Sequence, residues 1–218
     1  MIWRLLLAIG LLVYLPFVSA SAQEDSAAQI WHFDDIPVNQ LPSHVVLGTF
    51  FDGRPAGDWK VITTPKALSP PNVFAQLREK GAEYNMVLVD DVQAANLDLS
   101  VSFLPISGKG DMGGGLIWRA QDDRNYYLAR ANPLEQNIRI YRVVKGIRHL
   151  LKNFDQIIDA RKWHTLRVVQ RGCQVQVLYD DEQVFDLCDE TFKEGRIGLW
   201  TKSDAVTYFD DLRLVITH

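Results

Sequence analysis

Apolar and polar residues alternate with a period of two along most of the chain, starting near Trp31. The clearest case is residues 97–103, where apolar side chains occupy every second position. Such alternation is typical of a β-strand with one buried face. Further β-rich runs occupy residues 59–63, 73–77, 86–89, 116–119, 125–131, 137–144, 148–152, 163–170, 174–179, 182–187, 196–201 and 206–215. No long helical period appears, so the pattern predicts about a dozen strands.

Turn-forming residues separate these runs at intervals of about 8–12 residues, a spacing typical of an all-β sandwich or barrel. Lys145-Gly146, Arg171-Gly172 and Asn132-Pro133 are examples, and Asp-Asp pairs occupy positions 122–123 and 180–181. Each of these combinations favours a turn. The chain from residue 31 onward therefore reads as strands joined by turns.

The first 22 residues read as an export signal. Arg4 supplies a positive start, residues 5–18 are almost wholly apolar, and Ala20-Ser21-Ala22 offers the small residues that a signal peptidase requires. A membrane anchor is the alternative, but the apolar run is shorter than the roughly 20 residues that span a bilayer. We predict a signal peptide over residues 1–22, a linker over 23–30 and one domain over 31–218. The mature protein is then periplasmic or extracellular and not inserted in a membrane.

Charge narrows the choice of partners. The chain of 218 residues has a net charge of −4, and its basic residues are scattered. Nucleic-acid-binding domains usually carry a concentrated basic surface, and anionic membranes attract clusters of Lys and Arg. The composition therefore argues against both partners. No cofactor is predicted, apart from the calcium ion considered below.

The two cysteines, Cys173 and Cys188, predict a disulfide in an oxidising compartment. Residues 174–179 and 182–187 read as two strands around a two-residue turn, Asp180-Asp181. Counting outward from that turn places Cys173 opposite Cys188, close enough for a bridge. Two reduced, half-buried thiols are the alternative. Neither cysteine has the spacing of a zinc ligand.

Several motifs, taken in order, resemble a group of exported bacterial domains in the concanavalin A-like lectin/glucanase superfamily. These motifs are Trp59-Lys60-Val61, Ser69-Pro70-Pro71-Asn72-Val73, Gly113-Gly114-Gly115-Leu116-Ile117-Trp118-Arg119, Asn125-Tyr126-Tyr127, Asn132-Pro133-Leu134-Glu135, Trp163-His164-Thr165-Leu166-Arg167, Gly195-Arg196-Ile197-Gly198-Leu199-Trp200 and Phe209-Asp210-Asp211-Leu212. The resemblance is nearest to the 3-keto-disaccharide hydrolase domains (3-keto-glucoside hydrolases or lyases) and more distant to laminin-G-like domains. It implies an all-β, two-sheet antiparallel jelly-roll sandwich with a carbohydrate or another ligand in the groove of one sheet.

The resemblance leaves the activity open. Family-16 glycosidases carry a Glu-x-Asp-x-(x)-Glu strand, and a retaining mechanism needs two carboxylates about 5 Å apart. No run of this chain matches that strand. We therefore predict an exported carbohydrate-binding sandwich without two-carboxylate glycosidase chemistry. A 3-keto-glucoside hydrolase or lyase and a laminin-G-like structural or protein-binding domain remain as alternatives.

One predicted hairpin places polar residues together. If Ala120 faces Asn125, then Arg119, Tyr126 and Arg130 share one face of the sheet. Trp118 and Tyr127 lie on the other face, where we expect the core; Trp163, Trp200, Phe103 and Phe209 read as core residues too. Two arginines are rarely buried without partners, so the Arg-Tyr-Arg face is the predicted ligand groove. A solvated face of ion pairs is the alternative.

The next turn extends this candidate ligand-binding set to Asn132, Asn137 and Arg139. Glu135 lies in the same turn and is the candidate general acid or base, because it would sit beside the groove. The alternative is that Glu135 forms only a surface ion pair.

Acidic residues near the two ends of the domain raise the question of calcium. Terminal strands of a sandwich often pair, which would bring Asp34 toward Asp210 and Asp211. Carboxylates and backbone carbonyls are the ligands that Ca²⁺ prefers. The alternative is that each Asp ends a strand and caps a turn.

Overall fold

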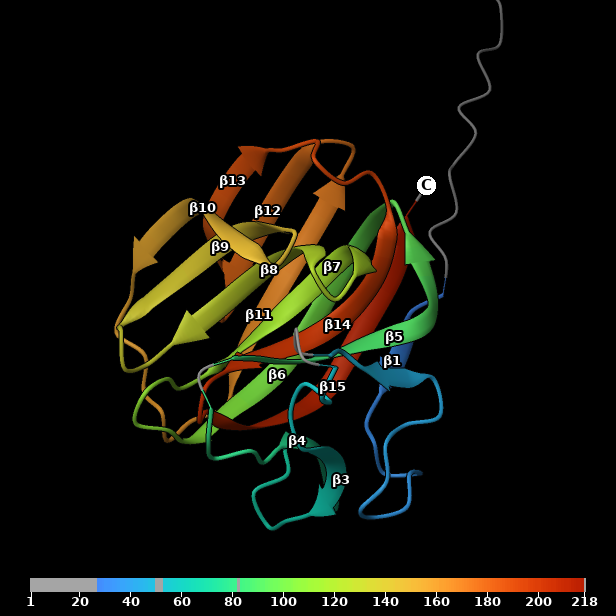
Figure 1. Ribbon diagram of the computed structural model, residues 1–218, viewed down its shortest axis with the longest axis vertical. Helices are drawn as coiled ribbons and strands as arrows, with labels where there is room; N and C mark the ends of the chain where they lie inside the picture. The colour runs from blue at the N-terminus through green and yellow to red at the C-terminus, as the bar shows by residue number, and fades with distance from the viewer. Residues whose placement is uncertain (1–26, 50–52, 82, 218) are drawn as a thin grey trace, which may run out of the picture.

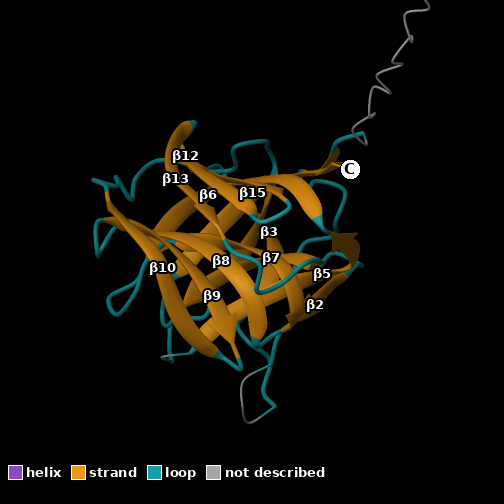
Figure 2. Ribbon diagram, turned by 90° about the horizontal axis from the view of Figure 1, so that it is seen from above, coloured by secondary structure: helices purple, strands orange, loops and turns teal. Residues whose placement is uncertain are grey.

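In the computed structural model, which describes residues 27–49, 53–81 and 83–217, the alternating runs form strands, and these residues include no helix. The strands make two antiparallel sheets that lie face to face (Figures 1 and 2). The prediction of an all-β, two-sheet antiparallel jelly-roll sandwich is confirmed.

The first sheet has eight strands and contains the disulfide hairpin. Its order is β13 (Glu182–Cys188), β12 (Gln174–Tyr179), β11 (His164–Arg171), β6 (Asn96–Ser107), β15 (Val206–Thr217), β4 (Asn72–Gln76) and β3 (Trp59–Thr63), and β1 (Gln29–Trp31) pairs with β15. The N-terminal strand of the domain thus pairs with the C-terminal one.

The second sheet has seven strands and carries the predicted polar face. Its order is β10 (Ile147–Asp155), β9 (Asn137–Val144), β8 (Asn125–Asn132), β7 (Gly114–Asp122), β14 (Gly195–Lys202), β5 (Tyr84–Ala94) and β2 (Val45–Leu47). Its strands β10 to β5 form the front layer in Figure 1.

The core between the sheets follows from the alternation. In β6, Leu97, Leu99, Val101 and Phe103 are fully buried, because every second side chain of the strand points toward the other sheet. From the opposite sheet, Trp118 donates a hydrogen bond from Nε1 to Gln170 Oε1, at 2.8 Å. The indole therefore fills the core and has its polar atom satisfied.

Five of the six aromatic residues predicted to be core are buried, and four of them lie between the two sheets. Trp118, Tyr127, Phe103 and Phe209 belong to the core between the sheets. Trp163 does not, because it is only half buried at one end of the sandwich, where Nε1 donates to the Lys66 carbonyl. Trp200 is buried, but on the other face of the seven-stranded sheet, since it faces away from the core on the strand where Leu199 faces into it.

The cysteine hairpin confirms the disulfide and corrects its register. Cys173 and Cys188 are bonded, with their Cα atoms 4.7 Å apart. The turn pairs Tyr179 with Glu182 as predicted, but a bulge beside Val177 shifts the pairing, so that Gln174 lies opposite Cys188. Cys173 is one residue out of the predicted position and still within bridging distance.

The predicted signal peptide, residues 1–22, lies outside the described residues. The predicted linker does not end at residue 30, because Gln29 and Ile30 already pair with Leu214 and Arg213 in β1 and β15. Within the described ranges, no helix is long and apolar enough to cross a membrane.

Candidate functional site

The β7–β8 hairpin has the predicted register over most of its length. Ile117 pairs with Leu128, and Gly115 pairs with Arg130. Toward the turn, however, the pairing jumps from Trp118 directly to Asp122, so β7 contains a bulge. Arg119 lies in this bulge with φ of 47°. The bulge turns its side chain out of the predicted alternation.

Arg119 therefore does not lie on the face of Tyr126 and Arg130, and that part of the prediction is wrong. It is 2% exposed, and its guanidinium donates to the carbonyls of Ala95, Gly172 and Phe192 at 2.5–2.9 Å. These carbonyls belong to three separate connections at one end of the sandwich. Arg119 thus ties chain segments together and is not available to a ligand on the outer face.

The outer face is the face of the seven-stranded sheet that points away from the other sheet. One row of directly paired residues crosses it: Trp200 faces Gly115, Gly115 faces Arg130, and Arg130 faces Arg139. A Cβ at Gly115 would meet the Arg130 Cβ at 2.9 Å and the Ala129 carbonyl oxygen at 2.6 Å. The position therefore excludes a side chain, because neighbouring atoms already fill the space that it would need.

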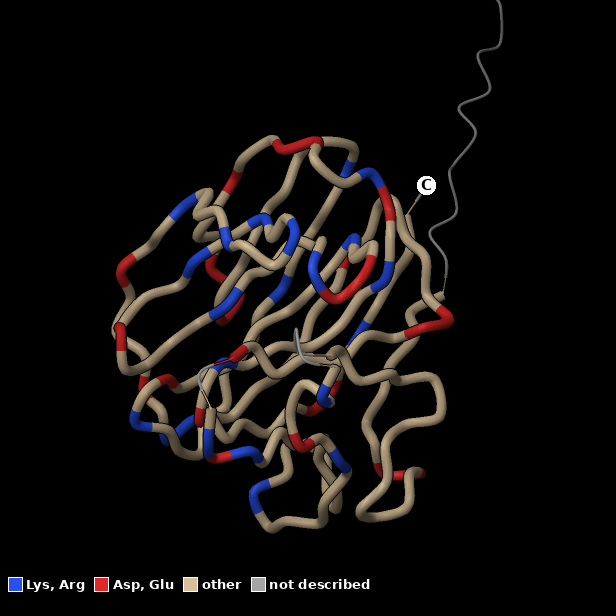
Figure 3. Tube along the Cα trace, viewed as in Figure 1, with Lys and Arg blue, Asp and Glu red and all other residues tan. Residues whose placement is uncertain are grey.

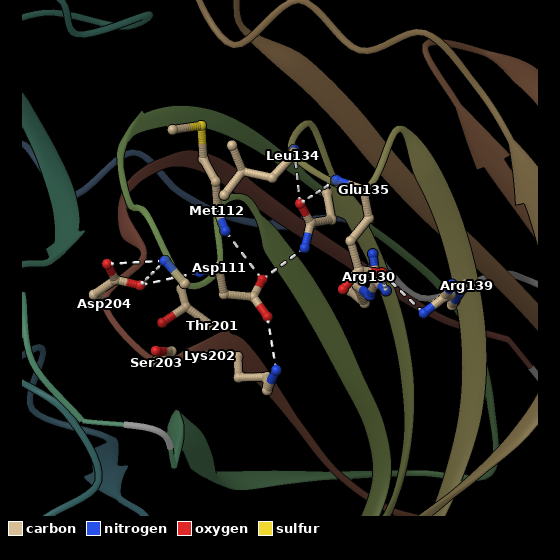
Figure 4. Close-up of polar contacts among 12 residues, drawn as sticks. Asp111, Met112, Arg130, Leu134, Glu135, Arg139, Thr201, Lys202, Ser203 and Asp204 are labelled. Atoms are coloured by element: carbon tan, nitrogen blue, oxygen red, sulfur yellow. Dashed lines mark hydrogen bonds and ion pairs between the residues drawn. The ribbon is translucent and has the colours of Figure 1, made fainter.

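Glu135 links the two arginines of this row (Figure 4). Its Oε2 lies 2.8 Å from Arg130 Nη2 and 2.8 Å from Arg139 Nη1. Arg130 also donates from Nη1 to Asn137 Oδ1, at 2.7 Å. The Arg130 side chain is 4% exposed, whereas those of Arg139 and Glu135 are 31% and 40% exposed. The buried guanidinium thus holds a half-exposed carboxylate in place.

A second carboxylate, Asp111, lies beside this group (Figure 4). Asn132 Nδ2 donates to Asp111 Oδ1 at 2.7 Å, and Lys202 Nζ lies 3.0 Å from Asp111 Oδ2. The carbonyl oxygen of the Asn132 side chain accepts from the backbone N–H of Glu135 at 3.1 Å. Asn132 therefore connects the two carboxylates. The seven residues Asp111, Arg130, Asn132, Glu135, Asn137, Arg139 and Lys202 are named the polar cluster below.

The loop that carries Asp111 is held by Asp204. Its carboxylate accepts from the backbone N–H groups of Lys109, Gly110 and Asp111 at 2.7–3.2 Å. Three backbone donors around one carboxylate fix the loop, and the carboxylate contacts the polar cluster only through the Asp111 backbone N–H. Asp204 thereby anchors the loop that presents the Asp111 side chain (Figure 4).

The pKa values of the two carboxylates in the polar cluster are shifted in opposite directions. Burial raises the pKa of Asp111 above its ordinary value, although Lys202 and Arg130 oppose the shift. Burial would also raise the pKa of Glu135, but the charge and hydrogen bond of Arg130, with Asn137 and Arg139, outweigh it and lower the pKa. Glu135 is therefore ionised at neutral pH and serves as a fixed acceptor.

An apolar cluster lies beside the polar cluster on the outer face. It comprises Ala56, Met86, Leu88, Ile117, Ala120, Tyr126, Leu128, Tyr141, Val143 and Trp200, with Tyr84 packed against them. Tyr126 lies on this face as predicted, but it is fully buried rather than open to a ligand. It is covered because Arg148 and the segment around Ala56 pack on the same side.

Arg148 shows that the sheet curls. Its guanidinium carbon lies 5.0 Å from the ring centroids of Tyr84 and Tyr141 and 5.7 Å from that of Trp200. Arg148 belongs to β10 and Tyr84 to β5, which would be about 24 Å apart in a flat sheet with this strand order, at about 4.8 Å per strand. The outer face is therefore concave. Tyr84, Tyr141 and Trp200 are named the aromatic cage below.

The structure thus brings together five predicted site residues, namely Arg130, Asn132, Glu135, Asn137 and Arg139. Sequence reasoning missed Asp111, Lys202 and the aromatic cage. Lys202 could have been predicted, because it lies two residues after Trp200 in the same strand and so shares its face. Asp111 sits in a loop between glycines, where no periodicity applies.

The candidate calcium ligands serve as hydrogen-bond acceptors. Asp210 accepts from the backbone of Leu68 and Ser69, and Asp34 accepts from the backbone of Asn72 at 2.9 Å. Asp211 Oδ1 lies 2.6 Å from His32 Nδ1. The part of the chain that the structure describes contains no group of three or more His, Cys, Asp or Glu side chains arranged for a metal. Calcium binding stays a prediction without support from these contacts.

A separate hollow of about 390 Å³ lies beside Trp163. Lys66, Pro105, Ile106 and Arg161 are among its lining residues. Trp163 Nε1 already donates a hydrogen bond to the Lys66 carbonyl, and Arg161 forms an ion pair with Asp159. This hollow lacks the convergent polar groups of the polar cluster, which we therefore take as the candidate site.

Comparison with known proteins by sequence gives one relative of known name. No family model matches the chain. A segment of 108 residues, 48% of the chain, is 28% identical to the levanase of Bacillus subtilis. The chain covers only 16% of the length of that enzyme.

Comparison by structure agrees with the observed fold. The carbohydrate-binding module CBM66 of Bacillus subtilis covers 72% of this chain and 91% of its own, with a TM-score of 0.61 and 21% identity. The Crh5 transglycosylase covers 88% and 85%, with a TM-score of 0.58 and 12% identity. A Bacillus subtilis protein with a galectin-like fold covers 74% and 91%, with a TM-score of 0.52 and 9% identity. These likenesses concern the β-sandwich fold alone.

Proposed function

We propose that this protein is an exported carbohydrate-binding domain and that its polar cluster holds the ligand. The observation that carries the proposal is the ion-pair network of Arg130, Glu135 and Arg139 on a concave, partly aromatic face. Sugar sites combine fixed donors and acceptors with apolar or aromatic walls. Here the buried Arg130 fixes the acceptor, and Arg139 and Lys202 present partly exposed donors beside it.

The comparisons support the same class. The levanase match and the likeness to a carbohydrate-binding module both point to proteins that handle carbohydrate. The disulfide between Cys173 and Cys188 fits an oxidising compartment and hence the proposed export. The ionised, doubly paired Glu135 suits binding better than proton donation.

A glycan panel tests the proposal. The double variant Glu135→Gln/Arg139→Ala removes the exposed half of the network and leaves Arg130 in place, so we expect loss of glycan binding with the fold retained by circular dichroism. Arg171→Ala is the matched control, because Arg171 is exposed at the end of β11 in the other sheet. Unchanged glycan binding by the double variant contradicts the assignment. Binding to a protein and to no glycan selects the laminin-G-like alternative.

A hydrolase or lyase acting on 3-keto-glucosides is the second candidate. The observation that favours it is the pair of carboxylates with pKa values shifted apart, Asp111 upward and Glu135 downward, since such pairs divide acid and base roles in enzymes. Turnover of a 3-keto-glucoside that disappears in both Asp111→Asn and Glu135→Gln supports this candidate. Binding without product release by the native protein excludes it.

A further inference from the structure

The Arg148 guanidinium contacts aromatic rings and, among the described residues, no hydrogen-bond acceptor. It lies over all three rings of the aromatic cage at 5.0–5.7 Å. Among the residues that the structure describes, none accepts a hydrogen bond from it or forms an ion pair with it. Cation–π contacts to Tyr84, Tyr141 and Trp200 fix where the guanidinium lies. Its five N–H groups stay available to a ligand.

Two further polar atoms of this face have no partner. Tyr126 Oη and Trp200 Nε1 are buried, and neither has a hydrogen-bond partner among the described residues. Buried polar groups are nearly always paired in folded proteins. One of these atoms belongs to a ring of the aromatic cage and the other to its apolar floor. Tyr126 is fully buried and its hydroxyl lies beside Trp200, so these two atoms are closed to a ligand. The N–H groups of Arg148 are the polar groups that the cage offers.

The concave face is positive on an acidic chain. Arg130, Arg139, Arg148 and Lys202 lie on it, against the three carboxylates Glu135, Asp111 and Asp155. Figure 3 shows Lys and Arg positions along β8, β9 and β10, at the front of the view. The chain as a whole carries −4. The charge is thus concentrated where the proposed ligand binds, and its sign favours an anion.

We propose that the ligand is an acidic polysaccharide and that Arg148 binds a uronate carboxylate. This inference rests on the proposed carbohydrate-binding function and names its substrate class. A planar guanidinium matches a carboxylate through two parallel hydrogen bonds. The aromatic cage holds Arg148 in one place before binding, so little side-chain entropy is lost when the carboxylate arrives. The polar cluster, two residues along β14 from the indole of the cage, then binds hydroxyl groups of the same chain of sugars.

The test compares polymers that differ only in the carboxyl group. Polygalacturonate and alginate are each measured by isothermal titration against the same polymer with its carboxyl groups reduced to hydroxymethyl groups. We expect the native protein to bind at least one acidic polymer about tenfold or more tightly than its reduced counterpart, the effect of one charged hydrogen-bonded pair. Arg148→Met fills the cage without donors and is expected to abolish this difference, whereas Arg148→Lys keeps a charge and part of the difference.

The control is Arg171→Ala, which removes the same charge from the other sheet and is expected to keep the native preference. Thermal melting of each variant shows that the fold is retained. Equal affinity for acidic and reduced polymers, or a preference that survives in Arg148→Met, overturns the inference and leaves carbohydrate binding in place. A preference lost equally in Arg171→Ala overturns it too, because overall charge then explains the effect. Failure to bind any polysaccharide overturns the proposed function itself.

Discussion

Removing the guanidinium of Arg119 should weaken the fold without touching ligand binding. We consider Arg119→Met, which keeps an apolar stem of similar length and removes every donor. The native guanidinium donates to the carbonyls of Ala95, Gly172 and Phe192. Ala95 lies where β5 of one sheet passes into β6 of the other, and Phe192 lies between β13 and β14, which also belong to different sheets. The variant therefore loosens the end of the sandwich where the two layers are joined.

The expected loss follows from the hydrogen bonds that the buried guanidinium makes to three carbonyls, those of the exposed Ala95 and Gly172 and of the half-buried Phe192. Each lost hydrogen bond to a charged group costs about 1–3 kcal/mol. In the variant, the connections relax enough to let water bind the three carbonyls, so the total cost lies in the lower part of the range summed over them. We therefore expect the free energy of unfolding to fall by about 3–5 kcal/mol. Folded domains of this size are stable by only about 5–15 kcal/mol. The change should be easy to measure and leave part of the protein folded.

Urea unfolding followed by tryptophan fluorescence measures this loss. With a denaturant slope of about 2 kcal/mol per molar urea, the midpoint should fall by about 1.5–2.5 M. Arg171→Ala, on an exposed site, should stay within about 0.5 kcal/mol of the native protein. A loss below about 1 kcal/mol in Arg119→Met, with native slope, would refute the view that this guanidinium holds the two layers together.

Three more outcomes follow from the contacts. Replacing both Cys173 and Cys188 by Ser should lower the free energy of unfolding by about 3 kcal/mol or less, because the bridge closes a short loop; a thermal melt unaffected by reductant would contradict this. Backbone donors outweigh burial and lower the pKa of Asp204 to about 2. A depressed pKa in the fold contributes stability above pH about 4 that is lost as the pH falls toward 2. Acid unfolding of Asp204→Ala should lack this dependence, and an unchanged acid profile would speak against the loop anchor. Tyr126→Phe deletes a buried hydroxyl without a partner, so urea unfolding should show equal stability or a gain of about 1 kcal/mol; a clear loss would show that the hydroxyl is paired.

Local pattern was enough for the strands but not for their irregularities. The alternation at residues 97–103 predicted β6 correctly, because the period of two is a property of the extended backbone. The same count failed at Arg119 and at Cys173, since a bulge adds a residue to one strand and shifts every later pairing. Residue type alone does not predict either bulge.

The candidate site shows the same division. Arg130, Asn132, Glu135, Asn137 and Arg139 lie within ten residues on one hairpin, so turn and alternation could group them in advance. Asp111 and Lys202 join this group from a loop and from β14, which lies beside β7 only because of the strand order. The aromatic cage joins β5, β9 and β14 to Arg148 of β10.

The sequence by itself determined the fold class, most strands, the disulfide and five of the seven residues of the polar cluster, because each of these depends on neighbours along the chain. The tertiary structure alone decided that Arg119 is a structural tie, that Trp200 faces outward and that Arg148 rests on three rings. The physical reason is that strand order, bulges and the curl of a sheet set distances between residues far apart in the chain. Those distances depend on the packing of the whole sandwich, which no local period records.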